Sequence, residues 1–281
     1  MLFVLLWSTG FIVARYATRD AGPLTFIAIR LFVAALLLVV MAWLTHAPKP
    51  DRTQSKWLVI SAFGMHTMYL CGVFVSIDLG MPSGVSALIA GLHPVATSLL
   101  AHRLLREHLR RKQWVGVVMG FIGVVLVVID RLAAKSTGIT GWTLLAAAAS
   151  VVGMSGGTLV QRRFSQDAPL LWGSVVQYSS SALTVLVGAI MIEHFEIDFT
   201  AQTLFSLAWA VIVLSLAAVL VMLWLLQRRA AANVSSLFFL TPALSTIEGA
   251  ILFGERLGAL AILGLVGGLA GVALVTRAFG D

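Results

Sequence analysis

The same short pattern occurs twice in this chain, once in each half, and the two occurrences lie 148 residues apart. It consists of a proline, a glutamate and three glycines in a fixed order. The first occurrence comprises Pro94, Glu107, Gly116, Gly120 and Gly123, and the second comprises Pro242, Glu255, Gly264, Gly268 and Gly271. Further apolar identities fall on the same offset, which indicates an internal duplication. We therefore predict two copies of one structural unit, at residues 1–135 and 136–281.

The composition places this duplicated unit in a lipid bilayer. Hydrophobic residues make up 59% of the chain and charged residues 11%, and the mean hydropathy is +0.99. Too few polar side chains remain to cover a water-facing surface. The net charge of +7 comes from short loops between apolar runs, which argues against nucleic acid as a partner. Cys71 is the single cysteine, and the sequence predicts no disulfide framework, no metal site and no cofactor.

Apolar runs of about 20 residues, enough for a helix to cross a bilayer, occur five times in each half. The predicted spans are 1–17, 23–45, 57–78, 82–103, 112–130, 139–161, 169–192, 203–226, 231–252 and 257–277. No segment alternates as a barrel strand would. We therefore predict an all-α integral membrane protein with ten transmembrane helices. The first span begins at Met1 without a cytoplasmic flank or a recognisable signal peptide, so we expect a truncated or misassigned start.

The distribution of Lys and Arg predicts how these spans are oriented. With a cytoplasmic N-terminus, 13 basic residues fall in inside segments and 5 in outside segments, as the positive-inside rule requires. Both termini are then cytoplasmic, and we expect a bacterial inner membrane. Because each half has an odd number of spans, the second half enters the membrane from the opposite side. The prediction is two inverted five-helix repeats, an architecture common among secondary transporters.

At this point the chain resembles ten-span members of the drug/metabolite transporter superfamily, with two EamA-type repeats. The motifs that carry the resemblance are Trp7-Ser8-Thr9-Gly10, Arg30-Leu31-Phe32, Pro94 with Glu107, and Pro242 with Gly254-Glu255-Arg256-Leu257. The resemblance implies a central cavity lined by the first, third and fourth spans of each half. It also implies transport of amino acids, drugs or other metabolites, and these motifs specify the fold better than the substrate.

Two polar stripes at helical spacing are candidates for the substrate-binding cavity. They comprise Thr241, Ser245 and Glu248 in the ninth span and His93, Thr97 and Leu100 in the fourth. A polar stripe that faces lipid is unfavourable, so we expect both to face the cavity or each other. Pro94 and Pro242 interrupt these spans near mid-membrane. They act as hinges beside the substrate or, in the alternative interpretation, as static kinks.

Glu248 is the most informative single side chain, because a carboxylate inside a span is costly unless it is paired or neutral. One interpretation is a protonated packing residue. The other, which we favour, is a coupling group that binds a proton on one side of the membrane and releases it on the other.

Several aromatic and polar side chains near mid-membrane complete the predicted cavity: Trp7, Ser8, Thr9, His66 and Tyr69. A lone buried histidine is more often a satisfied core residue than a proton carrier, and Trp7 can equally serve packing. The remaining motifs are assigned to structure. Glu107 and Glu255 complement helix N-termini, and the repeated glycines allow close helix contact between the fifth and tenth spans.

Arg30 and Trp224 are also assigned to structure. Arg30, inside the second span, is expected to snorkel outward or to pair with Asp20. Trp224 is expected at the inner membrane boundary, where tryptophans are enriched.

The sequence thus favours a secondary-active exporter of a small metabolite such as an amino acid, working by alternating access as a monomer or homodimer. No Walker motif suggests ATP use, so either a gradient drives transport or transport is facilitated diffusion. Coupling to protons through Glu248 is one hypothesis for the gradient. One alternative is a sugar-phosphate or nucleotide-sugar exchanger, which would need Lys or Arg in the cavity. The other is a membrane-embedded enzyme that uses His66, His93 and Glu248 as metal ligands or acid/base groups. A metal site usually needs about three or four converging ligands, whereas these three come from separate helices. We predict no catalytic residues.

Overall fold

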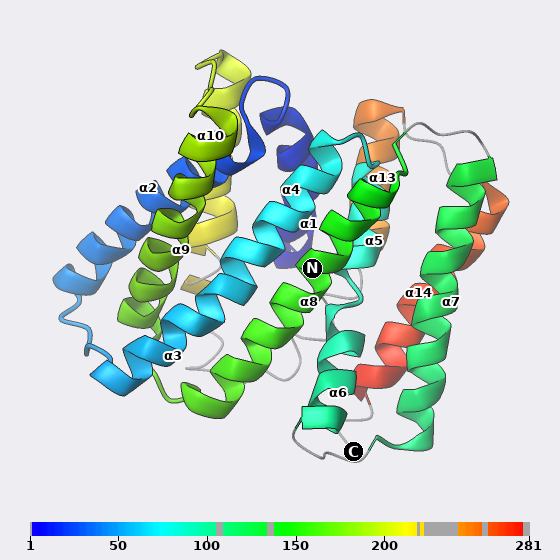
Figure 1. Ribbon diagram of the computed structural model, residues 1–281, viewed down its shortest axis with the longest axis horizontal. Helices are drawn as coiled ribbons and strands as arrows, with labels where there is room; N and C mark the ends of the chain where they lie inside the picture. The colour runs from blue at the N-terminus through cyan, green and yellow to red at the C-terminus, as the bar shows by residue number, and fades with distance from the viewer. Residues whose placement is uncertain are drawn as a thin grey trace.

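The computed structural model describes residues 2–104, 109–133, 138–217, 220–221, 241–254 and 258–277. This described part is helical, apart from turns and an isolated antiparallel bridge between Ala21 and Ile197 (Figure 1). Six of its helical segments are long and apolar enough to cross a membrane, and two shorter apolar helices accompany them. Large apolar side chains such as Trp43 and Ile251 remain exposed on the helices, as in a protein covered by lipid. The prediction of an all-helical membrane protein is confirmed.

The described helices divide between the two halves of the chain. In the first half they are α1 (Leu2–Ala17), α2 (Pro23–Leu44), α3 (Arg52–Ala62), α4 (Tyr69–Asp78), α5 (Ser83–Ala90), α6 (His93–Leu104) and α7 (Arg111–Ala133). In the second half they are α8 (Gly141–Phe164), α9 (Leu170–Glu193), α10 (Ala201–Val211), α13 (Thr241–Phe253) and α14 (Ala259–Arg277). Residues 231–240 of the predicted ninth span lie outside the described residues, as do Glu107, Trp224 and Glu255.

Two π-helical segments occur at nearly equivalent positions of the two halves. Segment η1 (Phe63–Met68) joins α3 to α4, and η2 (Ile212–Ala217) continues α10. Their starts lie 149 residues apart, one residue from the offset of the duplicated pattern. A π-helical turn widens the backbone by one residue per turn and occurs frequently at functional sites. The sequence analysis did not predict either segment.

The fourth span is interrupted before Pro94, and Pro94 does not cause the interruption. Helix α5 ends at Ala90, and α6 begins at His93, so Pro94 lies in the first turn of a new helix. Its missing N–H is harmless there, because that group would have no partner in the first turn. A turn at Gly91 separates the two helices, and a Cβ on Gly91 would lie 2.9 Å from Cγ of Pro242. The two prolines are therefore close to one break, although Pro94 does not itself kink a continuous helix.

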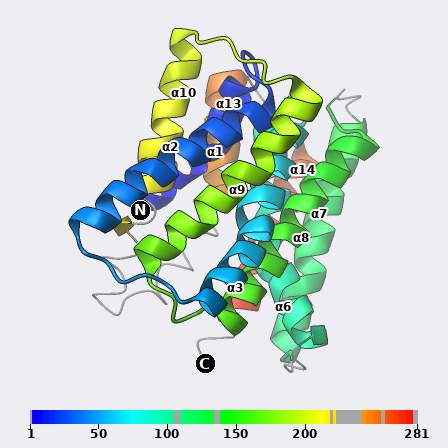
Figure 2. The same ribbon diagram turned by 60° about the vertical axis from the view of Figure 1, so that its left-hand side comes forward.

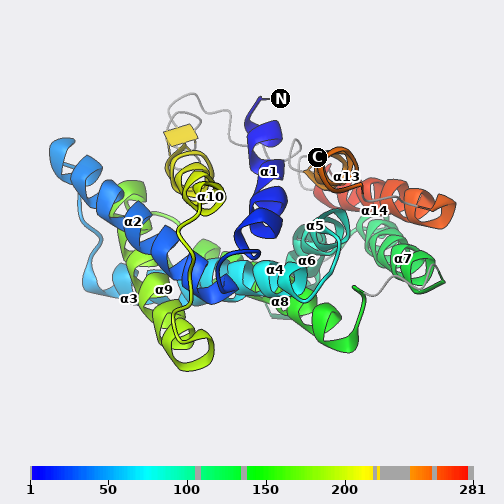
Figure 3. The same ribbon diagram turned by 90° about the horizontal axis from the view of Figure 1, so that it is seen from above.

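Equivalent helices of the two halves pack against one another. Helix α2 contacts α9 and α7 contacts α14 (Figure 2), and α5 contacts α13. Cross-pairs also correspond, since α1 contacts α13 while α6 contacts α8, and α1 contacts α10 while α4 contacts α8. Seen from above, α1 lies between α10 and α13, and the α7–α14 pair lies at one end of the molecule (Figure 3). The site is therefore built where the two halves meet.

The α7–α14 contact depends on glycines from the duplicated pattern. A Cβ on Gly123 would meet the backbone carbonyl of Gly264 at 2.5 Å and the backbone of Gly268 at 2.6 Å. A Cβ on Gly271 would likewise meet the backbone of Gly116 and Gly120. Backbone atoms cannot move aside as a flexible side chain can, so these positions accept only glycine at this separation. The expected contact between the fifth and tenth predicted spans is confirmed.

At one end of the bundle, the turn after α1 is fastened to the loop after α9. The Glu193 carboxylate accepts the backbone N–H groups of Leu24 (2.9 Å) and Thr25 (2.8 Å), which are free donors in the first turn of α2. Backbone pairs extend this contact, which we call the turn clamp: Gly22 with Glu196, Asp20 with Asp198, and the bridge Ala21–Ile197.

Candidate functional site

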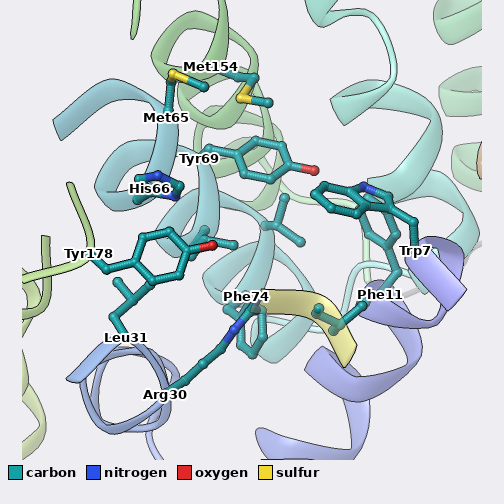
Figure 4. Close-up of a pocket in the computed structure, with 14 residues that line it drawn as sticks. Trp7, Phe11, Arg30, Leu31, Met65, His66, Tyr69, Phe74, Met154 and Tyr178 are labelled. Carbon is teal, nitrogen blue, oxygen red and sulfur yellow. The ribbon is translucent and has the colours of Figure 1, made fainter. Parts of the chain in front are cut away.

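A cavity of about 160 Å³ lies between the two halves. Its walls come from α1, α2, η1, α4, α8, α9 and η2, and most of the lining is apolar or aromatic (Figure 4). The lining residues are Trp7, Gly10, Phe11, Arg30, Leu31, Met65, His66, Tyr69, Leu70, Val73, Phe74, Met154, Tyr178 and Leu214. An apolar cavity with a few polar groups is typical of a small-molecule site. We call it the main cavity.

A smaller cavity of about 40 Å³ shares three walls with the main cavity, namely Trp7, Phe11 and Tyr69. Its other lining residues are Ala87, Ala90, Gly91, His93, Pro94, Thr241 and Pro242. Two positions of the predicted stripes, His93 and Thr241, therefore face this second space. The break between α5 and α6 lies on the same wall.

Arg30 lines the main cavity, so the predictions that it snorkels outward or pairs with Asp20 are wrong. Its side chain is 7% exposed, and Nε donates a 3.2 Å hydrogen bond to Oγ of Ser215 on η2. Asp20 instead accepts hydrogen bonds from Thr200 (2.6 Å) and Thr203 (3.2 Å) in the turn clamp region. The second span thus contributes a permanent positive charge to the cavity.

His66 and Tyr69 reach the main cavity because α3, η1 and α4 form one continuous helical segment that crosses the molecule. The His66 ring meets Tyr178 edge-on, with ring centroids 4.7 Å apart. In Figure 4 the hydroxyl groups of Tyr69 and Tyr178 both point toward the side of the cavity formed by Trp7 and Phe11. These hydroxyls and the imidazole supply hydrogen-bonding groups in an otherwise apolar space.

The other predicted site residues lie outside both cavities. Oγ of Ser8 on α1 donates a 2.5 Å hydrogen bond to Oε1 of Glu248 on α13, and Oγ of Ser245 donates to the backbone carbonyl of Ser8 (3.0 Å). In the ninth-span stripe, Thr241 therefore faces the smaller cavity, whereas Ser245 and Glu248 face α1. Thr9 accepts a 2.9 Å hydrogen bond from the Trp209 indole. Thr97 donates to the backbone carbonyl of His93 in its own helix at 2.7 Å.

Comparison with known proteins accords with this architecture. The model of the EamA-like transporter family matches two separate stretches of the chain, residues 1–129 and 141–277. The chain belongs to the EamA-like transporter family. It is therefore a membrane transporter of the drug/metabolite transporter superfamily rather than an enzyme.

Named relatives of this EamA-like transporter cover nearly its whole length. It is 25% identical to a "Probable amino-acid metabolite efflux pump" of Salmonella typhimurium, over 97% of this chain and 91% of the relative. It is 22% identical to an Escherichia coli protein with the same description, over 95% and 89%. A solved crystal structure with 20% identity aligns with a TM-score of 0.68 over 99% of this chain and 96% of the other. That likeness concerns the fold alone.

Within this EamA-like transporter, the cavity lining follows the duplication. Four pairs of lining residues are related by the 148-residue offset: Arg30 and Tyr178, His66 and Leu214, His93 and Thr241, and Pro94 and Pro242. Each half therefore contributes the same positions to the shared space, with different side chains. The second span of each half takes part through Arg30 and Tyr178, which the expected lining by spans 1, 3, 4, 6, 8 and 9 left out.

Four lining residues of this EamA-like transporter were not predicted from the sequence as part of the site: Arg30, Tyr178, Phe11 and Phe74. Two signals could have found the first pair. A charged side chain within an apolar span is a functional candidate by default, and the strict repeat offset aligns Arg30 with Tyr178. The phenylalanines carry no comparable signal, because lipid-facing and cavity-facing aromatic residues look alike in one sequence.

Proposed function

We propose that this EamA-like transporter is a secondary-active exporter of a small metabolite, such as an amino acid, and that it works by alternating access. The observation that supports the proposal most directly is the lining of the two adjoining cavities by four repeat-related residue pairs, two pairs in each cavity. If the two halves exchange conformations, such a cavity opens first to one face and then to the other. The two relatives described as amino-acid metabolite efflux pumps support the direction and the substrate class.

The proposal includes ten spans in two inverted repeats, at residues 1–135 and 136–281, with both termini in the cytoplasm of a bacterial cell. The matching helix contacts support it, because α2 pairs with α9 and α7 with α14 across the halves. Pro94 and Pro242 act as hinges beside the break between α5 and α6 in this scheme. The partners are the bilayer, the substrate and, through Glu248, protons.

A sugar-phosphate exchanger is the second candidate, and Arg30 is the observation that favours it. The absence of a cavity cation was the argument against this alternative, and the position of Arg30 removes that argument. One guanidinium is nevertheless a small counter-charge for a phosphate that carries a charge near −2 at neutral pH. A metabolite exporter therefore remains the preferred function.

The test is a differential metabolite measurement in cells that overproduce the wild-type chain or a blocked variant. Gly10→Leu places a side chain in the main cavity, where a Cβ already lies 3.7 Å from Leu214. Gly156→Leu on α8 is the matched control, because a Cβ there meets nothing within 4 Å. Metabolites that accumulate outside wild-type and Gly156→Leu cells, and not outside Gly10→Leu cells, are the exported substrates. Equal export by all three would contradict transport through this cavity.

A further inference from the structure

We propose that Arg30 is the anchor for a carboxylate group on the substrate and that the aromatic walls of the main cavity hold an apolar body. The proposal rests on the proposed function, since it names the substrate class of the same cavity. It begins with charge. Arg30 is permanently cationic, it is 7% exposed, and no acidic side chain lines either cavity in the described part of the chain. A buried charge without a partner is unfavourable, so the site is suited to an anion.

The described residues leave most of the hydrogen-bond donors of Arg30 available. A guanidinium has five N–H groups. Within the described residues, the bond from Nε to Ser215 is the single hydrogen bond of this side chain. Ser215 itself donates to the backbone carbonyl of Ala210 at 3.1 Å, so its oxygen is oriented to accept from Arg30. Ser215 therefore positions the guanidinium, and the remaining N–H groups are free to bind two carboxylate oxygens at once.

Three acidic side chains of the surrounding helices and turns are engaged elsewhere. Glu193 accepts the N–H groups at the start of α2, and Glu248 accepts from Ser8. Asp20 accepts from the threonines that begin α10. No carboxylate lines the main cavity in the described part of the chain, and the site therefore suits a carboxylate supplied by a bound molecule.

The size and walls of the cavity restrict the rest of the molecule. A volume of about 160 Å³ is close to that of cavities that hold a benzene ring, roughly 150 Å³. Phe11, Phe74, Tyr69 and Tyr178 form the walls around this space (Figure 4). One cation neutralises a monocarboxylate, whereas a phosphate would remain negatively charged in an apolar site. The substrate class is therefore a small monocarboxylate with an aromatic or branched apolar body.

The experiment measures binding to the purified full-length protein, without any transport step. Isothermal titration calorimetry compares the affinity for 3-phenylpropionate with the affinities for its amide, which has the same shape and no charge, and for phenyl phosphate. We expect the carboxylate to bind at least 10-fold more tightly than either. Arg30→Gln should remove this preference, and Arg30→Lys should restore part of it because the charge returns without the two-pronged geometry. Arg163→Gln, at the end of α8 and outside both cavities, is the control for net charge and should preserve the preference.

Equal binding of 3-phenylpropionate and its amide by the wild-type protein would overturn the proposal, as would failure of 3-phenylpropionate to bind. Tighter binding of phenyl phosphate would overturn the proposed carboxylate class and indicate a phosphate substrate instead. The wild-type comparison stands even if Arg30→Gln does not fold. A preference for the carboxylate together with no transport in proteoliposomes would refute the proposed function and leave the anchor intact. Transport without this preference would refute the anchor alone.

Discussion

Ser8 and Glu248 join the first helix of one half to the fourth span of the other through a 2.5 Å hydrogen bond. The second carboxylate oxygen of Glu248 is buried and has no partner among the described residues. Helix α1 also carries Trp7, Gly10 and Phe11 into the main cavity. Glu248 therefore contacts α1, which forms part of the cavity wall, but does not itself line the cavity. A change in its protonation would act on the substrate through α1 rather than by direct contact.

Glu248→Gln is expected to uncouple transport from protons. The amide preserves the size of the side chain and can still accept from Ser8, but it cannot exchange a proton. In proteoliposomes, substrate exchange should remain measurable, while accumulation driven by an imposed ΔpH should be lost. Glu196→Gln, an equivalent change in an exposed loop, should affect neither measurement. If Glu248→Gln retains both accumulation and pH dependence, the residue serves packing and the proton-coupled mechanism is wrong.

His93→Gln is expected to weaken substrate affinity more than it changes the pH profile. His93 lines the smaller cavity, where its Nδ1 lies 3.2 Å from the backbone carbonyl of Ala90 at the helix break. Its role in this scheme is to shape the site rather than to carry the proton. Initial exchange rates across substrate concentration and pH separate the two effects, and a profile shifted in pH with unchanged affinity would assign the proton to His93 instead.

Thr241→Leu should reduce transport without reducing membrane insertion, because leucine inserts at least as well as threonine. The buried Thr241 hydroxyl has no hydrogen-bond partner in the described part of the chain, and the side chain faces the smaller cavity. Thr241→Val keeps the shape and removes only the hydroxyl. If the substrate uses that hydroxyl, Val should raise the apparent KM roughly 5- to 10-fold, equivalent to about 1 kcal/mol. Normal transport by both variants would remove Thr241 from the site.

Cysteine accessibility tests the proposed topology. Leu109 lies two residues before α7, and the start of α7 and the loop between α9 and α10 lie at opposite ends of the bundle (Figure 1). In a Cys71→Ala background, a cysteine at Leu109 should be labelled from the cytoplasm, and one at Ile197 from outside. Labelling of both from the same side would contradict the inverted repeats.

Gly264→Ala should destabilise the protein, whereas Gly267→Ala, on the same helix, should not. A Cβ at Gly264 meets the backbone carbonyl of Gly123 and lies 2.9 Å from Val127, but one at Gly267 meets nothing within 4 Å. Overpacking of this kind typically costs about 1–3 kcal/mol. Thermal unfolding in detergent should show a lower Tm for Gly264→Ala alone. Equal Tm values would show that the α7–α14 contact adjusts freely.

The helix limits were predictable from sequence where hydropathy alone determines them. The predicted spans 23–45 and 169–192 differ by one residue at most from the ends of α2 and α9, because a bilayer sets the length of an apolar helix. The contact between α7 and α14 was also predictable, because glycines spaced along one helix face allow another backbone to approach closely there. The duplication in the sequence predicts which helices of the two halves are equivalent.

The direction of individual side chains was not predictable in the same way. Arg30 was assigned to a membrane boundary on depth alone, whereas its contact with Ser215 depends on how α2 rotates against η2. The π-helical segments change that rotation by one residue, and no sequence pattern marks them. Glu248 shows the same limit, because its spacing from Thr241 is helical but its carboxylate meets Ser8 rather than the cavity.

The turn clamp has a consequence for the direction of transport. In the proposed topology it lies at the outer face. If outward opening separates Glu193 from the start of α2 and breaks the Ala21–Ile197 bridge, the outward-open state loses these bonds. Each such bond is worth about 1 kcal/mol net, and every 1.4 kcal/mol is a tenfold change in population. An idle molecule would then wait with its cavity turned to the cytoplasm, where cargo is made. Solute that builds up outside the cell would find few molecules ready to carry it back.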